Sequence, residues 1–242
     1  MTTAIDIQNI DKQFVLRHTR SLKEALVWLL RGRKGDLTGK FHALRNVSLQ
    51  VGEGETVALL GFNGSGKSTL LKHISGVMQP DSGTVRTRGR VAGLIEVGAG
   101  FHPDLSGRDN VYLNGAILGM SEAEIKEKFD SIVEFAEIGE FIDTEVKFYS
   151  SGMYLRLAFS VAVHTDPDVF LVDEILAVGD EPFQRKCLAK IKELASAGKT
   201  LVVVSHDLEL VGQVCERGVL LEHGTVLMDG PVKEVISRLR GQ

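Results

Sequence analysis

The sequence predicts an α/β fold: a mixed, largely parallel sheet with flanking helices, an inserted helical subdomain and an antiparallel β portion. Apolar runs of strand length alternate with helical patterns over most of the 242 residues, which is typical of a parallel sheet built from βαβ units. The run Gly61–Thr69 is a complete phosphate-binding loop between an apolar segment and a helical one, which is the context that such a loop requires. We expect one domain, residues 1–242.

The elements are expected in the following order. Five apolar segments predict strands: Ile5–Asn9, Val47–Val51, Thr56–Leu60, Val169–Val172 and Leu201–Val204. Near the end, Val219–Met228 is typical of a hairpin whose turn is His223–Gly224. Residues 95–165 follow a helical pattern, and Ser121–Glu124 matches a capping box at a helix start. We expect this middle block to be the inserted helical subdomain.

Composition limits the class of protein. With 43% hydrophobic residues, the chain is able to bury a sizeable core. The formal charge of −4 gives no basic field, so we expect no nucleic-acid partner. The two cysteines, Cys187 and Cys215, have no CxxC spacing and fit a reducing compartment. The N-terminus lacks the features of a signal peptide, and no apolar run approaches the ~20 residues that span a bilayer.

The phosphate-binding loop carries the strongest chemical signal. Gly61, Gly64 and Gly66 let backbone N–H groups turn toward phosphate oxygens without Cβ clashes. Lys67 is placed to reach the β- and γ-phosphates, and the Ser68 hydroxyl to bind Mg²⁺. The alternative is a glycine-rich turn with an incidental lysine. We expect a nucleoside triphosphate to be bound by the whole loop: Gly61, Phe62, Asn63, Gly64, Ser65, Gly66, Lys67, Ser68 and Thr69.

A second segment, Asp168–Glu174, is an apolar strand that ends in two carboxylates. The carboxyl ends of parallel strands meet at the edge of the sheet where phosphates bind. Asp173 is therefore expected to hold Mg²⁺, and Glu174 to orient the attacking water as a general base. The alternative is a solvated loop.

A third segment, Tyr149–Met153, reads Tyr-Ser-Ser-Gly-Met and precedes an apolar helix. A serine hydroxyl and a glycine N–H at a helix start cap the helix, and they are also able to bind a phosphate. With the phosphate loop upstream and Asp173 downstream, the chain resembles the ATP-binding subunit of an ATP-binding cassette (ABC) transporter. Tyr149–Met153 corresponds to the signature segment of that family.

The resemblance implies roles for further residues. Phe14 resembles the aromatic residue that stacks on adenine, the alternative being a core aromatic. His206 resembles the switch histidine that contacts the γ-phosphate, the alternative being a capping or core histidine. Asp180 matches the loop that communicates across a dimer. In such cassettes two copies pack head to tail, so Ser150 and Gly152 would serve the nucleotide of the partner copy. The implied cofactors are ATP and Mg²⁺.

Departures from the family average resemble one subfamily. The signature segment differs from the common Leu-Ser-Gly-Gly-Gln, and Leu-Ala-Val-Gly-Asp at residues 176–180 replaces the usual Ser-Ala-Leu-Asp. The segment that usually carries a Mg²⁺-binding glutamine reads Glu-Val-Gly-Ala-Gly-Phe-His-Pro, with Glu96 nearest that position. These phrases resemble ATPases that export lipid-linked polysaccharides of the O-antigen, teichoic acid or galactan type.

Residues 17–40 form an insertion that is longer than a typical cassette has. The segment holds seven Lys and Arg against two acids, and Ser21–Glu24 predicts a short helix that is apolar over most of its circumference. We expect it at the membrane face, against the transmembrane subunit or lipid headgroups. The alternative is a solvated basic loop that packs Trp28 on its own domain.

The leading hypothesis is a homodimeric ATPase that moves a lipid-linked glycan through a separate permease, present in two copies. Such a protein would be peripheral, at the cytoplasmic face of the inner (plasma) membrane. The alternative is an ABC ATPase for another cargo, such as a drug or small molecule, which predicts a glutamine near position 96 and a standard signature. A soluble ABC ATPase acting on DNA or ribosomes, or a P-loop kinase or GTPase, fits the sequence less well.

Overall fold

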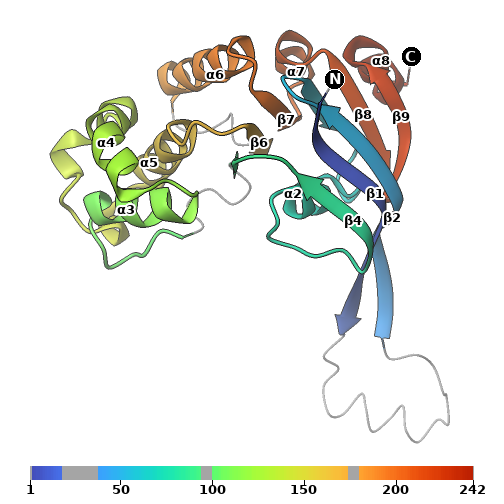
Figure 1. Ribbon diagram of the computed structural model, residues 1–242, viewed down its shortest axis with the longest axis horizontal. Helices are drawn as coiled ribbons and strands as arrows, with labels where there is room; N and C mark the ends of the chain where they lie inside the picture. The colour runs from blue at the N-terminus through green and yellow to red at the C-terminus, as the bar shows by residue number, and fades with distance from the viewer. Residues whose placement is uncertain (1, 18–37, 94–99, 174–179, 242) are drawn as a thin grey trace, which may run out of the picture.

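The computed structural model describes residues 2–17, 38–93, 100–173 and 180–241. Two sheets pack on each other, and a helical lobe stands to one side of them (Figure 1). The fold class predicted from the sequence is confirmed. Residues 18–37, which hold most of the expected basic insertion, lie outside the described residues, as do Glu96 and Glu174.

The central sheet has six strands in the order β5-β6-β7-β3-β8-β9. The five strands from β5 to β8 are parallel, and β9 is antiparallel to β8. Every residue of β3 and β7 is buried, as expected for central strands of a sheet covered on both faces. The strand bounds are Val91–Gly93 (β5), Val169–Asp173 (β6), Thr200–Val204 (β7), Thr56–Leu60 (β3), Arg217–Glu222 (β8) and Thr225–Pro231 (β9).

The second sheet is antiparallel, in the order β2-β1-β4. It consists of β1 (Thr3–Arg17), β2 (Thr38–Gly52) and β4 (Ser82–Thr87). The predicted strands Ile5–Asn9 and Val47–Val51 are therefore present. They are longer than expected and pair with each other, with Ile5 opposite Val51.

Two hydrophobic cores lie on the two faces of the central sheet. In β3, Val57 and Leu59 face the antiparallel sheet and α2 (Lys67–Ile74), whereas Ala58 and Leu60 face the opposite core. That opposite core is closed by α6 (Glu181–Ser196), α7 (Leu208–Val214) and α8 (Val232–Leu239). Strand alternation thus gives both faces a full apolar cover.

The helical lobe has a core of its own. It comprises α3 (Gly107–Ile117), α4 (Glu122–Ala136), η1 (Gly139–Phe141), η2 (Val146–Phe148) and α5 (Ser151–Val163). The predicted capping box is confirmed: the Ser121 hydroxyl accepts from the Glu124 N–H, and the Glu124 carboxylate accepts from the Ser121 N–H. The predicted hairpin is also confirmed, with His223 and Gly224 at φ 48° and 80° in its turn.

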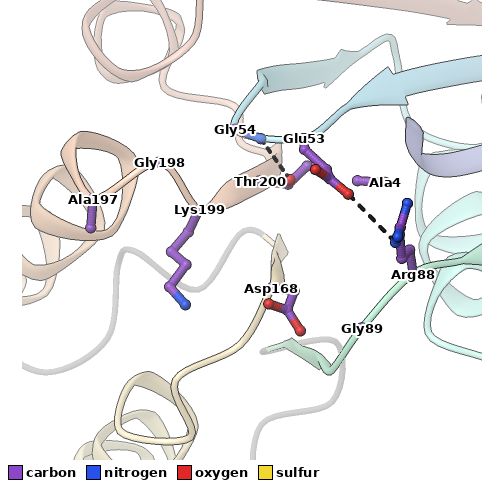
Figure 2. Close-up of a pocket in the computed structure, with 10 residues that line it drawn as sticks. All are labelled: Ala4, Glu53, Gly54, Arg88, Gly89, Asp168, Ala197, Gly198, Lys199 and Thr200. Carbon is purple, nitrogen blue, oxygen red and sulfur yellow. Dashed lines mark hydrogen bonds and ion pairs between the residues drawn. The ribbon is translucent and has the colours of Figure 1, made fainter. Parts of the chain in front are cut away.

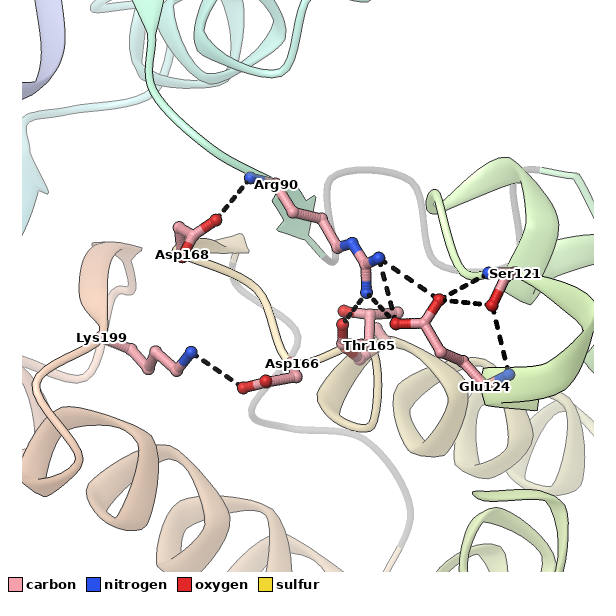
Figure 3. A network of polar contacts seen from close by, with 8 residues as sticks. Arg90, Ser121, Glu124, Thr165, Asp166, Asp168 and Lys199 are labelled. Atoms are coloured by element: carbon pink, nitrogen blue, oxygen red, sulfur yellow. Dashed lines mark hydrogen bonds and ion pairs between the residues drawn. The ribbon is translucent and has the colours of Figure 1, made fainter. Parts of the chain in front are cut away.

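Arg90 connects the helical lobe to the sheets through hydrogen bonds (Figure 3). Its guanidinium donates to the Thr165 carbonyl at 2.7 Å and to Glu124 Oε1 at 3.2 Å, while its backbone N–H donates to Asp168 Oδ2 at 2.7 Å. The backbone hydrogen bond from Ser121, then the Ser121 hydroxyl and Arg90, lower the pKa of Glu124 to about 2. A charged contact thus joins the start of α4 to the entrance of β5.

Candidate nucleotide site

The phosphate-binding loop connects β3 to α2 at the carboxyl edge of the central sheet. Gly61 has φ 143°, and a Cβ there would lie 2.2 Å from the Leu221 carbonyl oxygen. Gly66, the N-cap of α2, has φ 110°, and a Cβ there would lie 2.7 Å from the Ala43 carbonyl oxygen. Glycine is therefore required at both positions by conformation and by space.

The β8–β9 hairpin supports the same loop. The Gly224 N–H in the hairpin turn donates to the Ser65 carbonyl at 3.0 Å, and the Arg45 N–H from β2 donates to the Gly224 carbonyl at 2.8 Å. The hairpin turn that the sequence predicts at His223–Gly224 thus also positions the phosphate loop.

Lys67 is buried and folds back over the loop. Its Nζ donates to the Gly61 carbonyl at 2.8 Å and to the Phe62 carbonyl at 3.2 Å. The first turn of α2 contains no acidic residue, so the partial positive charge of the helix N-terminus is unopposed there. Lysine, loop N–H groups and helix start all favour an anion at this edge.

Two clefts flank the loop. One is lined by Asn63–Thr69 together with Phe41 and Ala43 of β2. The other is lined by loop residues 60–63, by Ser205, His206 and Leu208 after β7, and by residues 239–240 at the end of α8. The structure therefore brings His206 to the phosphate loop. The N-cap of α7 is Asp207 and His206 is exposed, so His206 neither caps α7 nor lies in the core.

The residues available for Mg²⁺ lie at the same edge. Asp173 is the last residue of β6, and α2, which carries Ser68 in its first turn, packs against β6. Among the described residues, no group of three or more His, Cys, Asp or Glu side chains could hold a metal by itself. A carboxylate and a hydroxyl beside a polyphosphate site nevertheless fit Mg²⁺, which commonly takes one or two protein oxygens plus substrate phosphates.

The signature segment lies in the helical lobe, on a different body of the fold from α2 (Figure 1). Ser150 is the N-cap of α5, and its hydroxyl accepts from the Met153 N–H at 3.2 Å. Gly152 is in the first turn of that helix. Neither residue lines the two clefts at the phosphate loop. One copy of the chain thus keeps apart the two helix starts for which the sequence predicts phosphate binding.

An aromatic residue that sequence reasoning missed is Phe41. It is 45% exposed and lines the cleft of the phosphate loop. Phe14 lies opposite Phe41 across the β1–β2 pair, so both side chains share one face. Phe14 is half-buried, with the Lys12 ammonium 5.9 Å from its ring centroid. The only signal for Phe41 would have been an aromatic residue just before the buried part of β2.

Asp180 is the N-cap of α6, but its side chain makes no capping hydrogen bond. Its Oδ1 instead accepts from Arg156 of α5 at 2.6 Å. Arg156 also donates to Glu137, at the end of α4, at 3.1 Å. The residue expected to communicate across a dimer is therefore joined to the helix that begins with the signature segment.

A further pocket lies at the opposite, amino edge of the central sheet (Figure 2). Its charges are compensated from within the chain: Lys199 pairs with Asp166 at 2.8 Å, and Arg88 lies 3.6 Å from Glu53. The Thr200 hydroxyl accepts from the Gly54 N–H at 3.0 Å. Nothing in this pocket resembles the glycine-rich cradle at the carboxyl edge.

Comparison with known proteins agrees with this geometry. The ABC transporter family matches residues 44–177. The chain is 50% identical to "ABC transporter protein AbcA" of Aeromonas salmonicida over 95% of this chain and 73% of that protein. It is 41% identical to "O-antigen export system ATP-binding protein RfbB" of Klebsiella pneumoniae over 98% of this chain and 97% of that protein.

Other relatives are longer than this chain. It is 41% identical to "Teichoic acids export ATP-binding protein TagH" of Bacillus cereus, but spans 43% of that protein. Among solved structures, a dimeric ATP-binding cassette in a post-hydrolysis state with ADP and Pi has a TM-score of 0.74 at 24% identity, over 94% of this chain and 98% of that one. At this identity, the likeness supports the fold.

Proposed function

Because the chain belongs to the ABC transporter family, as an ATP-binding and ATP-hydrolysing cassette, we propose that it powers export of a lipid-linked polysaccharide through a separate transmembrane subunit. The observation that carries this proposal is the 41% identity to an O-antigen export ATP-binding protein over 97% of that protein's length. The name of the teichoic acid relative supports the same class of cargo. We propose a peripheral position at the cytoplasmic face of the inner membrane. The described residues include no helix able to cross a bilayer.

We propose that the phosphate loop holds ATP, with Asp173 and Ser68 as the protein ligands of Mg²⁺. The metal would offset charge on the β- and γ-phosphates. His206 is placed beside the loop, where it is able to donate to the γ-phosphate. Glu174 remains our predicted base and Glu96 a predicted metal ligand, both outside the described residues. Phe41 joins Phe14 as a candidate for stacking on adenine, and comparing ATP affinity of Phe41→Ala and Phe14→Ala tests which one stacks.

We propose further that the working unit is a head-to-tail homodimer with two permease subunits. Ser150 and Gly152 lie on the lobe, away from the phosphate loop of their own chain. In a dimer they would meet the nucleotide held by the other copy, where the α5 start adds N–H donors. The expected basic insertion, residues 17–40, would contact the permease or lipid headgroups. Unchanged transport and assembly after charge reversal of Arg31, Arg33 and Lys34 would exclude that contact.

The catalytic part is tested with Glu174→Gln. We expect ATP binding to persist, hydrolysis to stop, and an ATP-dependent dimer to accumulate, because the amide cannot accept the proton from water. Equilibrium binding, phosphate release and light scattering measure the three effects. Undiminished hydrolysis would refute the assignment of Glu174 as base.

The cargo is tested in cells. Depletion of the protein should cause lipid-linked glycan to accumulate on the cytoplasmic side, and its sugars would identify the substrate. A matched strain carrying Lys67→Ala should accumulate the same glycan, because export needs ATP. Normal glycan export with loss of drug efflux would instead favour the alternative, an ATPase subunit for a drug or small-molecule transporter.

A further inference from the structure

Arg156 occupies the junction of three helices. From α5, its Nη1 donates to Glu137 Oε2 at 3.1 Å and its Nη2 donates to Asp180 Oδ1 at 2.6 Å. Glu137 follows α4 in the left-handed conformation, at φ 57° and ψ 40°, and Asp180 precedes α6. One guanidinium thus joins the end of one helix to the start of another.

An aromatic ring packs against one face of this guanidinium. Arg156 Cζ lies 4.8 Å from the ring centroid of Phe183, which is 1% exposed. The Arg156 side chain itself is 19% exposed. Cation–π contact and partial burial both strengthen an ion pair relative to one in open solvent. The Phe183 ring therefore positions the Arg156 guanidinium, and the guanidinium in turn positions the carboxylates of Glu137 and Asp180.

Lys186 of α6 completes the cluster. It donates to Glu137 Oε1 at 2.9 Å and to the Phe135 carbonyl at 3.0 Å. The hydrogen bond from Lys186, together with the charges of Lys186 and Arg156, lowers the pKa of Glu137. Glu137 is thus satisfied by Lys186 as well as by Arg156. The Asp180 carboxylate, by contrast, has Arg156 as its side-chain partner.

This difference separates two roles of Arg156. Its bond to Glu137 is backed by Lys186, so it adds to the packing of α4 on α6. Its bond to Asp180 fixes a carboxylate that is 59% exposed and remains accessible to a second molecule. Arg156 is six residues beyond Ser150, which places them ~9 Å apart along α5 at 1.5 Å per residue.

We propose that Arg156 is a positioning residue that sets the Asp180 carboxylate, at the start of α6, relative to the Ser150 end of α5, so that both meet a second copy of the chain as one preformed surface. This inference rests on the proposed function, because it assumes the head-to-tail dimer. Loss of Arg156 leaves the Asp180 carboxylate to be ordered on association, which weakens association without removing any contact to nucleotide. ATP binding by the phosphate loop of a single copy is unaffected.

The test is a double-variant cycle read out as ATP-dependent dimerisation of the full chain in the Glu174→Gln background. Arg156→Ala should weaken dimerisation about tenfold and Asp180→Ala at least as much, and the double variant should be no worse than Asp180→Ala alone, because Arg156 acts through that carboxylate. Arg156→Lys, which keeps the charge but loses the bidentate fork, should fall between wild type and Arg156→Ala. Arg185→Ala is the matched control, since that exposed arginine pairs with Glu181 within α6.

Three results would overturn the inference. Additive losses in the double variant would mean that Arg156 and Asp180 act separately. An Arg156→Ala protein with lowered thermal stability but unchanged dimerisation would reduce Arg156 to a structural role, and Glu137→Gln serves as the stability reference. Weakened ATP binding to the monomer would place Arg156 in the nucleotide site. If the Glu174→Gln protein with Arg156 intact does not dimerise with ATP, the proposed dimer itself is contradicted. That result is distinguishable from failure of the Arg156 inference, because it is obtained without any substitution at Arg156.

Discussion

The carboxyl and amino edges of the central sheet differ in how their charged groups are arranged and paired. At the carboxyl edge, glycines at positive φ turn the chain so that Lys67 and the start of α2 face a cleft with no acid in the first turn of the helix. At the amino edge, each charge near the pocket has a partner from its own chain, such as Arg88 with Glu53 (Figure 2) and Lys199 with Asp166 (Figure 3). The proposed nucleotide site is therefore at the carboxyl edge, where ligands bind in open α/β sheets, and the charged contacts at the amino edge stabilise the fold.

The amino edge is also tightly packed around Gly89. This residue has φ 79°, and a Cβ there would lie 2.1 Å from Asp168 Oδ2. That same oxygen accepts from the Arg90 N–H at 2.7 Å. Gly89 thus leaves room for a structural carboxylate, whereas Gly61 and Gly66 shape the loop that we propose binds phosphate.

The largest effect that separates the two edges is expected for Lys67→Ala. Removing the buried cation should lower the ATP turnover number by about a hundredfold or more, because charge on the phosphates then lacks a preorganised partner. Steady-state phosphate release measures it. Lys199→Ala, at the amino edge, is the control and should retain turnover. Equal losses in both variants would contradict the division between the edges.

Gly66→Ala should combine loss of function with loss of stability. A Cβ at φ 110° would press on the Ala43 carbonyl, so we expect ~1–3 kcal/mol of destabilisation. Denaturant unfolding measures it, alongside nucleotide affinity. Gly64→Ala is the matched variant, since its φ is 79° but a Cβ meets nothing within 4 Å. It should cost less, and an equal cost would show that conformation alone, rather than contact with β2, requires glycine at 66.

Gly89→Ala tests the amino edge by the same substitution. The new Cβ would displace the Asp168 carboxylate and its bond to Arg90, which we expect to cost ~1–3 kcal/mol in the free energy of unfolding. ATP affinity and turnover below the unfolding transition should remain within about twofold of wild type, since no nucleotide-binding group is touched. A turnover loss comparable to that of Lys67→Ala would show that the two edges are coupled.

Sequence predicted those parts of the fold and site that depend on local rules. The phosphate loop, the β8–β9 turn and the capping box at Ser121 each need only a few neighbouring residues of defined chemistry, and the structure contains all three. The pairing of β1 with β2 could not be predicted, because Ile5 lies opposite Val51, which is far from it in the sequence, and no local pattern signals that pairing. The bond between Arg156 and Asp180 was missed for a related reason: charge pairs between separate helices follow from packing, which periodicity does not encode.

The smallest effect is expected at the junction of lobe and sheets, for Glu124→Gln (Figure 3). The Glu124 pKa is lowered from 4.5 to about 2, first by the Ser121 N–H, then by the Ser121 hydroxyl and Arg90. A lowered folded-state pKa means that the carboxylate stabilises the fold above pH ~4.5 and that this contribution is lost as the pH falls through ~2. The variant should therefore be slightly less stable than wild type at pH 7, and the difference should shrink toward pH 2. Thermal unfolding across that range measures it, and a difference independent of pH would mean that Glu124 acts there by shape rather than by charge.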